Sequence, residues 1–196
     1  MKKLSFAVVA AFIGVVSSAL ALTVLSQNLE QLSKDADQII AGQVIEAKEG
    51  FDPEGRPIVT VTLQVEEAYK GEVGRRFSFK QLRAPKPEEG MGESLLSGSL
   101  PEYKKGEELV LFLSRPGSLG LTAPIGIMQG KFNVVTDDSG KKQVANLFNN
   151  KGLFSGMKNS HSLKSFSGSE KNIVKSSSPG PVNYDTFISL VKKLAQ

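Results

Sequence analysis

The stretch Val59-Thr60-Val61-Thr62-Leu63-Gln64-Val65-Glu66 is the clearest structural signal in the sequence, because apolar and polar residues alternate over all eight positions. Alternation with a period of two places the apolar side chains on one face of a β-strand and the polar ones on the other. One buried face and one solvated face are typical of an antiparallel sheet. The stretch therefore predicts a half-buried strand in a mainly β protein, with Val61, Leu63 and Val65 in the core.

Five further stretches are predicted to be strands. They lie at residues 38–46, 76–80, 109–113, 130–135 and 141–148. Residues 109–113 are apolar at every position, which indicates a central strand covered on both faces. Gly42 marks a bulge or a place where another backbone passes closely, and residues 137–140 are typical of a hairpin turn. We therefore expect six or seven antiparallel strands that form a small β-barrel.

Two amphipathic helices are predicted, one at each end of the strand region. Over residues 25–36, apolar residues recur at helical spacing and Ser26 can cap the first turn. Asn183 can cap a second helix near the C-terminus. The apolar stripe of that helix consists of Tyr184, Phe187, Ile188, Val191 and Leu194. A free helix of about twelve residues is marginal in water, so the stripe must pack on its own barrel, which we favour, or on a partner.

Four segments are expected along the chain. Residues 1–21 form a signal peptide, 22–152 a domain of helix plus β-barrel, 153–182 a disordered linker, and 183–196 the C-terminal helix. The linker prediction rests on composition, since the segment is rich in Ser, Lys and Gly and has too few apolar residues to bury a core of its own.

The prediction of export rests on the N-terminus. Lys2 and Lys3 precede an uncharged apolar run over residues 4–16, and Ala19 and Ala21 provide the small residues at a cleavage site. The alternative is an uncleaved anchor, but the run is short for a bilayer span of about 20 residues. We expect a bacterial protein that is periplasmic or secreted, with no stable membrane insertion after cleavage. The chain has no cysteine, so disulfides cannot support its fold.

The charge is distributed unevenly between the two parts of the chain. The whole sequence carries +4, whereas residues 22–150 hold 15 basic and 18 acidic side chains and residues 151–196 hold seven basic and two acidic ones. The body therefore has no basic excess, and no nucleic-acid partner is expected for it. The basic tail could touch an anionic surface, although scattered lysines are more often a solvated segment.

No catalytic, cofactor-binding or metal-binding residue is predicted. The single histidine, His161, lies in the Ser-rich segment, where nothing would orient it for catalysis. Gln129-Gly130-Lys131 lacks the upstream glycine and the Ser or Thr of a phosphate loop. Asp137 and Asp138 lack the ligand spacing of a calcium loop, and Glu66-Glu67 and Glu107-Glu108 point to opposite faces of strands. An enzyme is the least favoured class.

The candidate interaction site is the long segment 83–107, which interrupts the regular strand pattern. It carries Met91, Leu95, Leu96 and Tyr103. Apolar side chains on a loop either pack back on the body or meet a partner, because leaving them in water forgoes the gain from burial. Long loops in compact domains are often functional. The alternative is an insertion that covers one end of the barrel.

A resemblance to a family of small exported bacterial proteins with no established activity covers residues 25–150. It rests on Ala36-Asp37-x-Ile39-Ile40-x-Gly42-x-Val44, Val61-x-Leu63-x-Val65 with Tyr69-Lys70-Gly71, Pro101-x-Tyr103-x-x-Gly106-Glu107-x-x-Val110-Leu111-Phe112-Leu113, and Gln129-Gly130-Lys131-Phe132-x-Val134; residues 187–191 resemble the family's closing helix. More distantly, the order of elements is similar to netrin-like modules such as the tissue inhibitors of metalloproteinases, which implies an OB-like barrel. Those inhibitors depend on cysteine, so their activity does not carry over to this chain.

The function expected from the sequence is that of a non-catalytic, exported protein-interaction module whose partner is another exported protein. One alternative is an inhibitor-like partner of an exported protease, by analogy of fold alone. The other is an OB-type binder of carbohydrate or another ligand, which the absence of tryptophan and the scarcity of tyrosine argue against.

Overall fold

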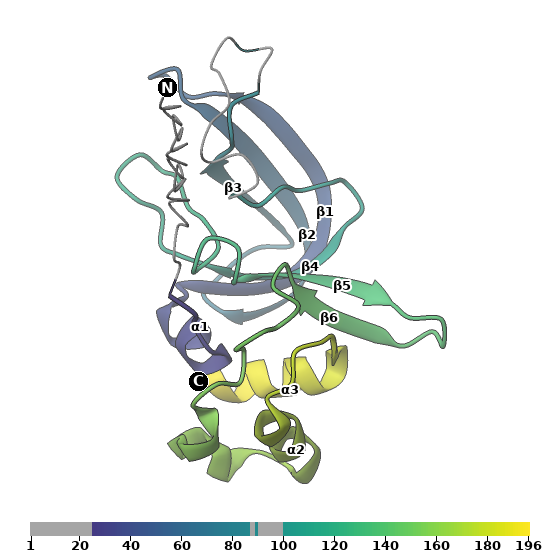
Figure 1. Cartoon of the computed structure of the whole chain (residues 1–196). Coiled ribbons are helices and arrows are strands. Elements are labelled where there is room, and N and C mark those ends of the chain that lie inside the picture. Colours follow the sequence, from purple (N-terminus) through teal and green to yellow (C-terminus); the bar gives the residue numbers. More distant parts are fainter. Residues whose placement is uncertain (1–24, 87–88, 90–99) are drawn as a thin grey trace, which may run out of the picture.

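A seven-stranded antiparallel sheet forms the body of the protein in the computed structural model, which describes residues 25–86, 89 and 100–196 (Figure 1). The strands are β1 (Gln38–Phe51), β2 (Pro57–Lys70), β3 (Arg76–Leu82), β4 (Glu108–Leu113), β5 (Lys131–Thr136), β6 (Lys142–Asn146) and β7 (Val182–Asn183). Their order is β3-β2-β1-β4-β5-β6-β7. The prediction of a mainly β, antiparallel protein is confirmed, whereas a closed barrel is not, because the edge strands β3 and β7 do not pair.

All six predicted strands are present, and the hairpin of β1 and β2 is longer than expected. The ladder continues past Glu46 to the pair Phe51 and Pro57. Residues 46–51 do not show the alternating pattern of a strand, because side chains on both faces of this part of β1 meet solvent. The backbone hydrogen bonds between β1 and β2 form there nevertheless, since they do not require apolar side chains. Gly42 is confirmed as a close approach: the β1–β2 register shifts beside it, and a Cβ at this position would collide with the carbonyl oxygen of Gln64.

Three helices gather on one side of the sheet (Figure 1). Helix α1 (Leu29–Asp35) begins later than predicted, and Asn28 rather than Ser26 caps it, in a capping box with Gln31. Helix α3 (Tyr184–Leu194) is capped by Asn183 as predicted. Helix α2 (Gly168–Ser176) was not predicted. None of the helices in the described part of the chain is long and apolar enough to cross a lipid bilayer.

The predicted disordered linker over 153–182 is wrong, because this segment is folded. It forms the 3-10 helices η2 (Met157–Asn159) and η3 (His161–Ser165), then α2 and β7. Its apolar residues are few, but nearly all of them enter the core: Leu153, Phe154, Met157, Phe166, Val174 and Val182 are buried. They are spaced too irregularly to show a helix or strand period. The segment can nevertheless fold because the sheet, α1 and α3 supply the other side of its core.

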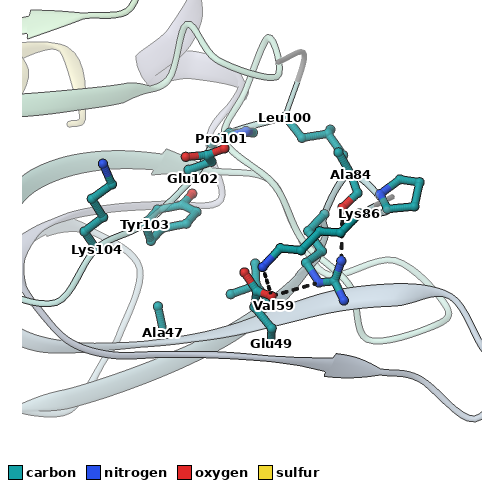
Figure 2. A pocket seen from close by; sticks show the side chains of 12 residues that line it. Ala47, Glu49, Val59, Ala84, Lys86, Leu100, Pro101, Glu102, Tyr103 and Lys104 are labelled. Atoms are coloured by element: carbon teal, nitrogen blue, oxygen red, sulfur yellow. Dashed lines mark hydrogen bonds and ion pairs between the residues drawn. The ribbon is translucent and has the colours of Figure 1, made fainter. Parts of the chain in front are cut away.

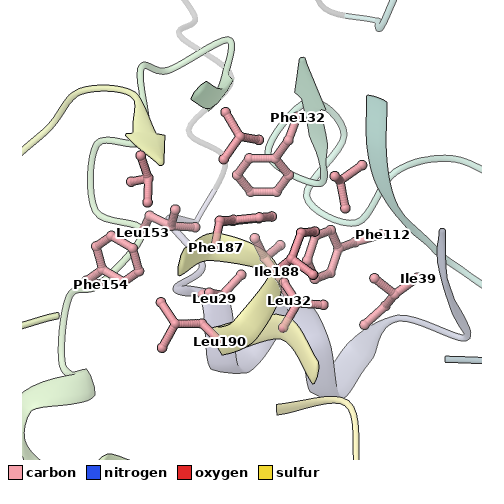
Figure 3. Packing of buried hydrophobic residues seen from close by; sticks show 14 of the residues in the cluster. Leu29, Leu32, Ile39, Phe112, Phe132, Leu153, Phe154, Phe187, Ile188 and Leu190 are labelled. Atoms are coloured by element: carbon pink, nitrogen blue, oxygen red, sulfur yellow. The ribbon is translucent and has the colours of Figure 1, made fainter. Parts of the chain in front are cut away.

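Two apolar clusters lie on opposite faces of the sheet, and β4 contributes to both of them. Leu109, Leu111 and Leu113 belong to one cluster, while Val110 and Phe112 belong to the other. The prediction of a central strand at 109–113 is therefore confirmed. In the second cluster Phe187 of α3 packs with its ring centroid 4.9 Å from Phe132 and 6.3 Å from Phe112 (Figure 3). The C-terminal helix thus docks on its own domain.

Strands β1–β4 form a four-stranded part of the sheet whose outer strands are β3 and β4, and residues 121–124 contact both of these outer strands. Leu121 forms an isolated bridge with Lys80 of β3, and Pro124 forms one with Leu113 of β4. The amide of Thr122 donates to the carbonyl of Lys80 at 2.8 Å. The first four strands are therefore bent toward one another across this short segment.

Candidate functional site

A cleft of about 430 Å³ opens between the β1–β2 hairpin and residues 100–104 (Figure 2). Ala47 and Glu49 of β1 and Val59 of β2 form one side of it. Residues 83–86, which follow β3, and residues 100–104, which precede β4, form the rest. Strand alternation explains the first side, since positions two apart on a strand project from the same face.

The cleft lies where β1 loses its neighbour in the sheet. Strand β4 pairs with β1 only over residues 38–43. One further pair of hydrogen bonds joins Val44 to the two residues just before β4. The Val44 amide donates to the carbonyl of Glu107 at 2.9 Å, and the Val44 carbonyl accepts from the amide of Gly106 at 2.8 Å. Beyond Val44, no strand in the described part of the chain pairs with this edge of β1. Residues 45–51 thus present an unpaired backbone edge beside the cleft.

Tyr103 forms part of the cleft wall. Its side chain is only 8% exposed, and its hydroxyl donates to Gln81 Oε1 at 3.1 Å. Gln81 in turn donates to the carbonyl of Pro101 at 2.8 Å. Phe79 packs edge-on against the Tyr103 ring at 5.6 Å, and the Lys131 ammonium lies 4.8 Å from the ring centroid. Burial raises the pKa of Tyr103, so the hydroxyl stays neutral and acts as a structural anchor.

The other three predicted interaction residues, Met91, Leu95 and Leu96, lie outside the described residues. The two ends of the segment that carries them, near residues 86 and 100, both border the cleft. The long segment therefore begins and ends at this site. The contribution of β1 was missed, because nothing in the local sequence of 45–51 indicates that its neighbour strand ends early.

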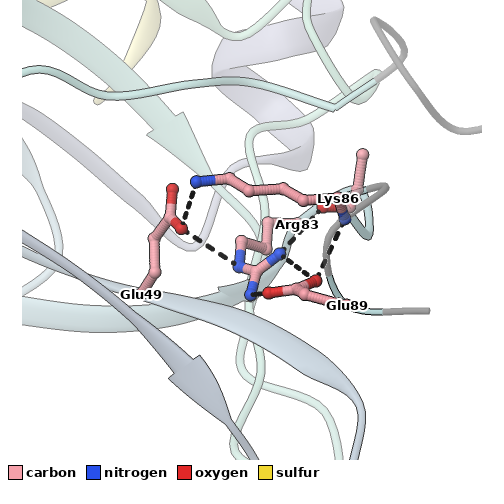
Figure 4. Close-up of polar contacts among 5 residues, drawn as sticks. Glu49, Arg83, Lys86 and Glu89 are labelled. Carbon is pink, nitrogen blue, oxygen red and sulfur yellow. Dashed lines mark hydrogen bonds and ion pairs between the residues drawn. The ribbon is translucent and has the colours of Figure 1, made fainter. Parts of the chain in front are cut away.

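A network of ion pairs anchors the chain after β3 to β1 (Figure 4). The guanidinium of Arg83 binds both carboxylate oxygens of Glu89, and its Nε lies 3.7 Å from Glu49 Oε2. Lys86 Nζ donates to the same Glu49 oxygen at 2.6 Å. The hydrogen bond from Arg83, together with the Lys86 amide, lowers the pKa of Glu89 to about 2. The network braces the cleft by linking β1 to the chain after β3, and its two cations balance its two anions.

Several carboxylates elsewhere in the described structure are paired within the protein. Glu107 pairs with Lys131, and Glu108 pairs with Lys142. Asp137 accepts from the hydroxyl of Ser139, which with the amide of Lys141 lowers its pKa to about 2. The described residues contain no group of three His, Cys, Asp or Glu side chains placed to hold a metal ion.

Comparison of the chain with protein-family models, with curated proteins and with solved structures finds no significant match.

Proposed function

We propose that this protein is an exported, non-catalytic interaction module, and that its cleft binds an extended segment of another exported protein. The segment would add to β1 as a strand, using the backbone edge at 45–51. The observation that carries this proposal is the early end of β4, after which no strand in the described part of the chain pairs with that edge beside the cleft. Strand addition to a free sheet edge is a common mode of peptide recognition.

The side chains around the cleft favour a peptide backbone over a sugar or an ion. Aromatic stacking, which sugar and base binding usually require, is hindered because Lys131 and Phe79 cover the ring of Tyr103. The charged groups Arg83 and Glu49 are engaged within the protein. Besides the side chains of Glu102 and Lys104, the polar groups at this end of the cleft are the backbone amides and carbonyls of β1. A partner strand would satisfy them and place alternate side chains over Ala47.

Photocrosslinking from β1 tests this proposal. A photoreactive phenylalanine analogue at Ala47, at the cleft, should capture an exported protein in the producing cell, whereas the same analogue at the neighbouring Lys48, on the other strand face, should not. A synthetic peptide covering the crosslinked segment should then bind the purified protein. Ala47→Trp should lower the affinity of the protein for that peptide at least about tenfold, and Lys48→Trp should leave this affinity unchanged.

A modified peptide separates strand addition from other modes without altering the protein. Methylating alternate backbone nitrogens of the peptide removes its ladder donors and should abolish binding. Equal affinity of the methylated and unmethylated peptides would contradict the proposal. So would a crosslink from position 47 that maps only to residues 87–99 of the same chain, since the cleft would then be covered by its own loop.

Export itself makes a separate prediction. The apolar run over 4–16 and the small residues Ala19 and Ala21 predict cleavage after Ala21, so the exported protein should begin at Leu22. Intact-mass measurement and N-terminal sequencing of protein recovered from the periplasm or the medium check this. A mature chain that keeps residues 6–16 would contradict it.

We also propose that β1–β4 form an OB-like unit with residues 121–124 as the closing segment. The two isolated bridges, to Lys80 and to Leu113, support this proposal. An experimental structure in which 121–124 lie away from β3 would contradict it.

A further inference from the structure

The segment 151–181, here called the lysine cap, exposes cationic side chains almost without acidic ones. It contains five lysines and a single acidic residue. The lysines are Lys151, Lys158, Lys164, Lys171 and Lys175, and none of them takes part in an ion pair within the described structure. The acidic residue, Glu170, is only 2% exposed, and it binds Lys193. Of the segment's own charged side chains, the solvent therefore meets almost only lysines; the acidic side chain of Glu30 from α1 contacts the segment through Ser160 and Ser162.

Folding gathers these lysines, which are scattered in the sequence, onto one lobe. Lys171 and Lys175 lie four residues apart on α2, one helical turn along the same side. Lys158 lies in η2 and Lys164 in η3. These 3-10 helices pack on each other, and η2 packs on α2. Figure 1 shows the lobe beneath α1 and α3, on the side away from the β1–β2 hairpin, and no residue of the lobe lines the cleft.

The N-terminal end of the described chain enters beside this lobe. Asn28, directly before α1, donates its side-chain amide to the carbonyl of Ser155 at 2.8 Å. Glu30 accepts hydrogen bonds from the hydroxyls of Ser160 and Ser162, at 2.7 Å and 2.6 Å. The predicted mature protein begins at Leu22, so cleavage removes the apolar run over 4–16. Any attraction of the mature protein to a bilayer would therefore come from the charge of the lysine cap.

The chemistry of the cap fits a diffuse anionic surface. All cations of residues 151–196 are lysines, whereas all five arginines lie between residues 56 and 115. Lysine carries a hydrated point charge and lacks the planar guanidinium group with which arginine binds a single phosphate through two hydrogen bonds. The phenylalanines of the cap, Phe154 and Phe166, are buried, so they offer no stacking platform for nucleic-acid bases. Clustered lysines of this kind attract anionic lipid headgroups.

We propose that the lysine cap docks the protein on an anionic lipid bilayer. The excess of acidic over basic side chains in residues 22–150 would be repelled by the same surface and would turn the sheet away from it. The cleft would then face outward. This inference does not depend on the function proposed for the cleft, because the two surfaces share no residues.

Sedimentation with lipid vesicles tests the proposal on the mature protein recovered after export. Vesicles of phosphatidylcholine with about 30% phosphatidylglycerol should bind it, and pure phosphatidylcholine vesicles should not. Raising the salt from about 0.05 M to about 0.5 M should weaken binding at least tenfold, because screening shortens the reach of the lysines. Replacing Lys158, Lys164, Lys171 and Lys175 together by Gln should also weaken binding at least about tenfold.

A matched variant separates the position of the charges from their number. Replacing Lys48, Lys80, Lys105 and Lys141 by Gln removes the same charge from exposed positions outside the cap, and it should leave vesicle binding near the wild-type level. Thermal melts should show both variants folded, since seven of the eight side chains are exposed and Lys171 is partly exposed. Equal losses in both variants, or no binding by the wild type, would overturn the proposal. Lysine-dependent binding to a single-stranded oligonucleotide without vesicle binding would also overturn it and indicate a nucleic-acid partner.

Discussion

Phe112→Ala should lower the free energy of unfolding by about 3–5 kcal/mol, the range for removing a fully buried aromatic side chain. Phe112 has no exposed surface, and its ring packs at 5.4 Å from Phe132 and 6.3 Å from Phe187. It therefore joins the central strand β4, strand β5 and helix α3. A loss of this size is a large share of a typical stability of about 5–15 kcal/mol. Chemical denaturation of the purified protein measures it.

Thr62→Ala provides the control for this prediction. Thr62 lies on the opposite face of its strand from Val61, and its hydroxyl shares an exposed 2.9 Å hydrogen bond with Ser78. Losing such a contact should cost at most about 1 kcal/mol. If both variants lost similar stability, the strand faces derived from the alternating pattern would be wrong.

Glu170→Gln should lower the free energy of unfolding by about 2–3 kcal/mol near neutral pH, because it removes one partner of a buried ion pair. The carboxylate accepts hydrogen bonds from the Lys193 ammonium and the Ser189 hydroxyl, both at 2.6 Å, and from the Ser167 amide. It thereby joins α2 to α3. Lys193 remains partly exposed, so water can solvate its ammonium and limit the loss.

The effect of Glu170→Gln should depend on pH. Burial alone would raise the pKa of Glu170, but the hydrogen bonds from Lys193, Ser189 and Ser167 outweigh burial and lower the pKa from 4.5 to about 2. The unfolded chain therefore binds the proton at higher pH than the folded one. The stabilisation is complete above about pH 4.5 and is lost as the pH falls toward 2, so the wild type and the variant should converge in acid.

Asp185→Ala is the matched control, because Asp185 is the only other acidic residue after position 150 and it is exposed in the first turn of α3. Removing its interaction with the helix dipole should cost only about 0.3–1 kcal/mol. Denaturation at pH 7 and pH 3 compares the three proteins. A difference between wild type and Glu170→Gln that stays constant over this range would show that the carboxylate charge does not stabilise the fold.

Local patterns in the sequence were sufficient to predict six of the seven strands and the helices α1 and α3, but not the open arrangement of the sheet. The alternation over 59–66 and the uniformly apolar run over 109–113 correspond to a half-buried strand and a central one, because the pleat of a strand repeats every two residues. Asn183 and the apolar stripe after it gave the C-terminal helix for a similar reason, since its period is 3.6 residues. These signals depend only on neighbours a few positions apart.

The candidate site was only partly predictable. The segment 83–107 was identified by its break in the strand pattern, and its two ends do border the cleft. The ion pairs of Arg83 with Glu89 and Glu49 were not identified, because Glu49 and Arg83 are far apart in the sequence and no periodic pattern links them. Tyr103 was expected as a contact residue, but the structure places its hydroxyl on Gln81.

The sequence by itself was enough to locate strands β1–β6 and helices α1 and α3, and to show that the basic charge lies in the C-terminal part, because backbone periodicity and composition are local properties. Only the tertiary structure decided that residues 153–182 are ordered, that no described strand pairs with β1 beyond Val44, and that Lys158, Lys164, Lys171 and Lys175 share one lobe. Each of these features depends on contacts between distant segments. Phe154 and Val174 are buried because they pack in one cluster with residues of the sheet, α1 and α3. No local sequence pattern predicts contacts between segments that are so far apart in the chain.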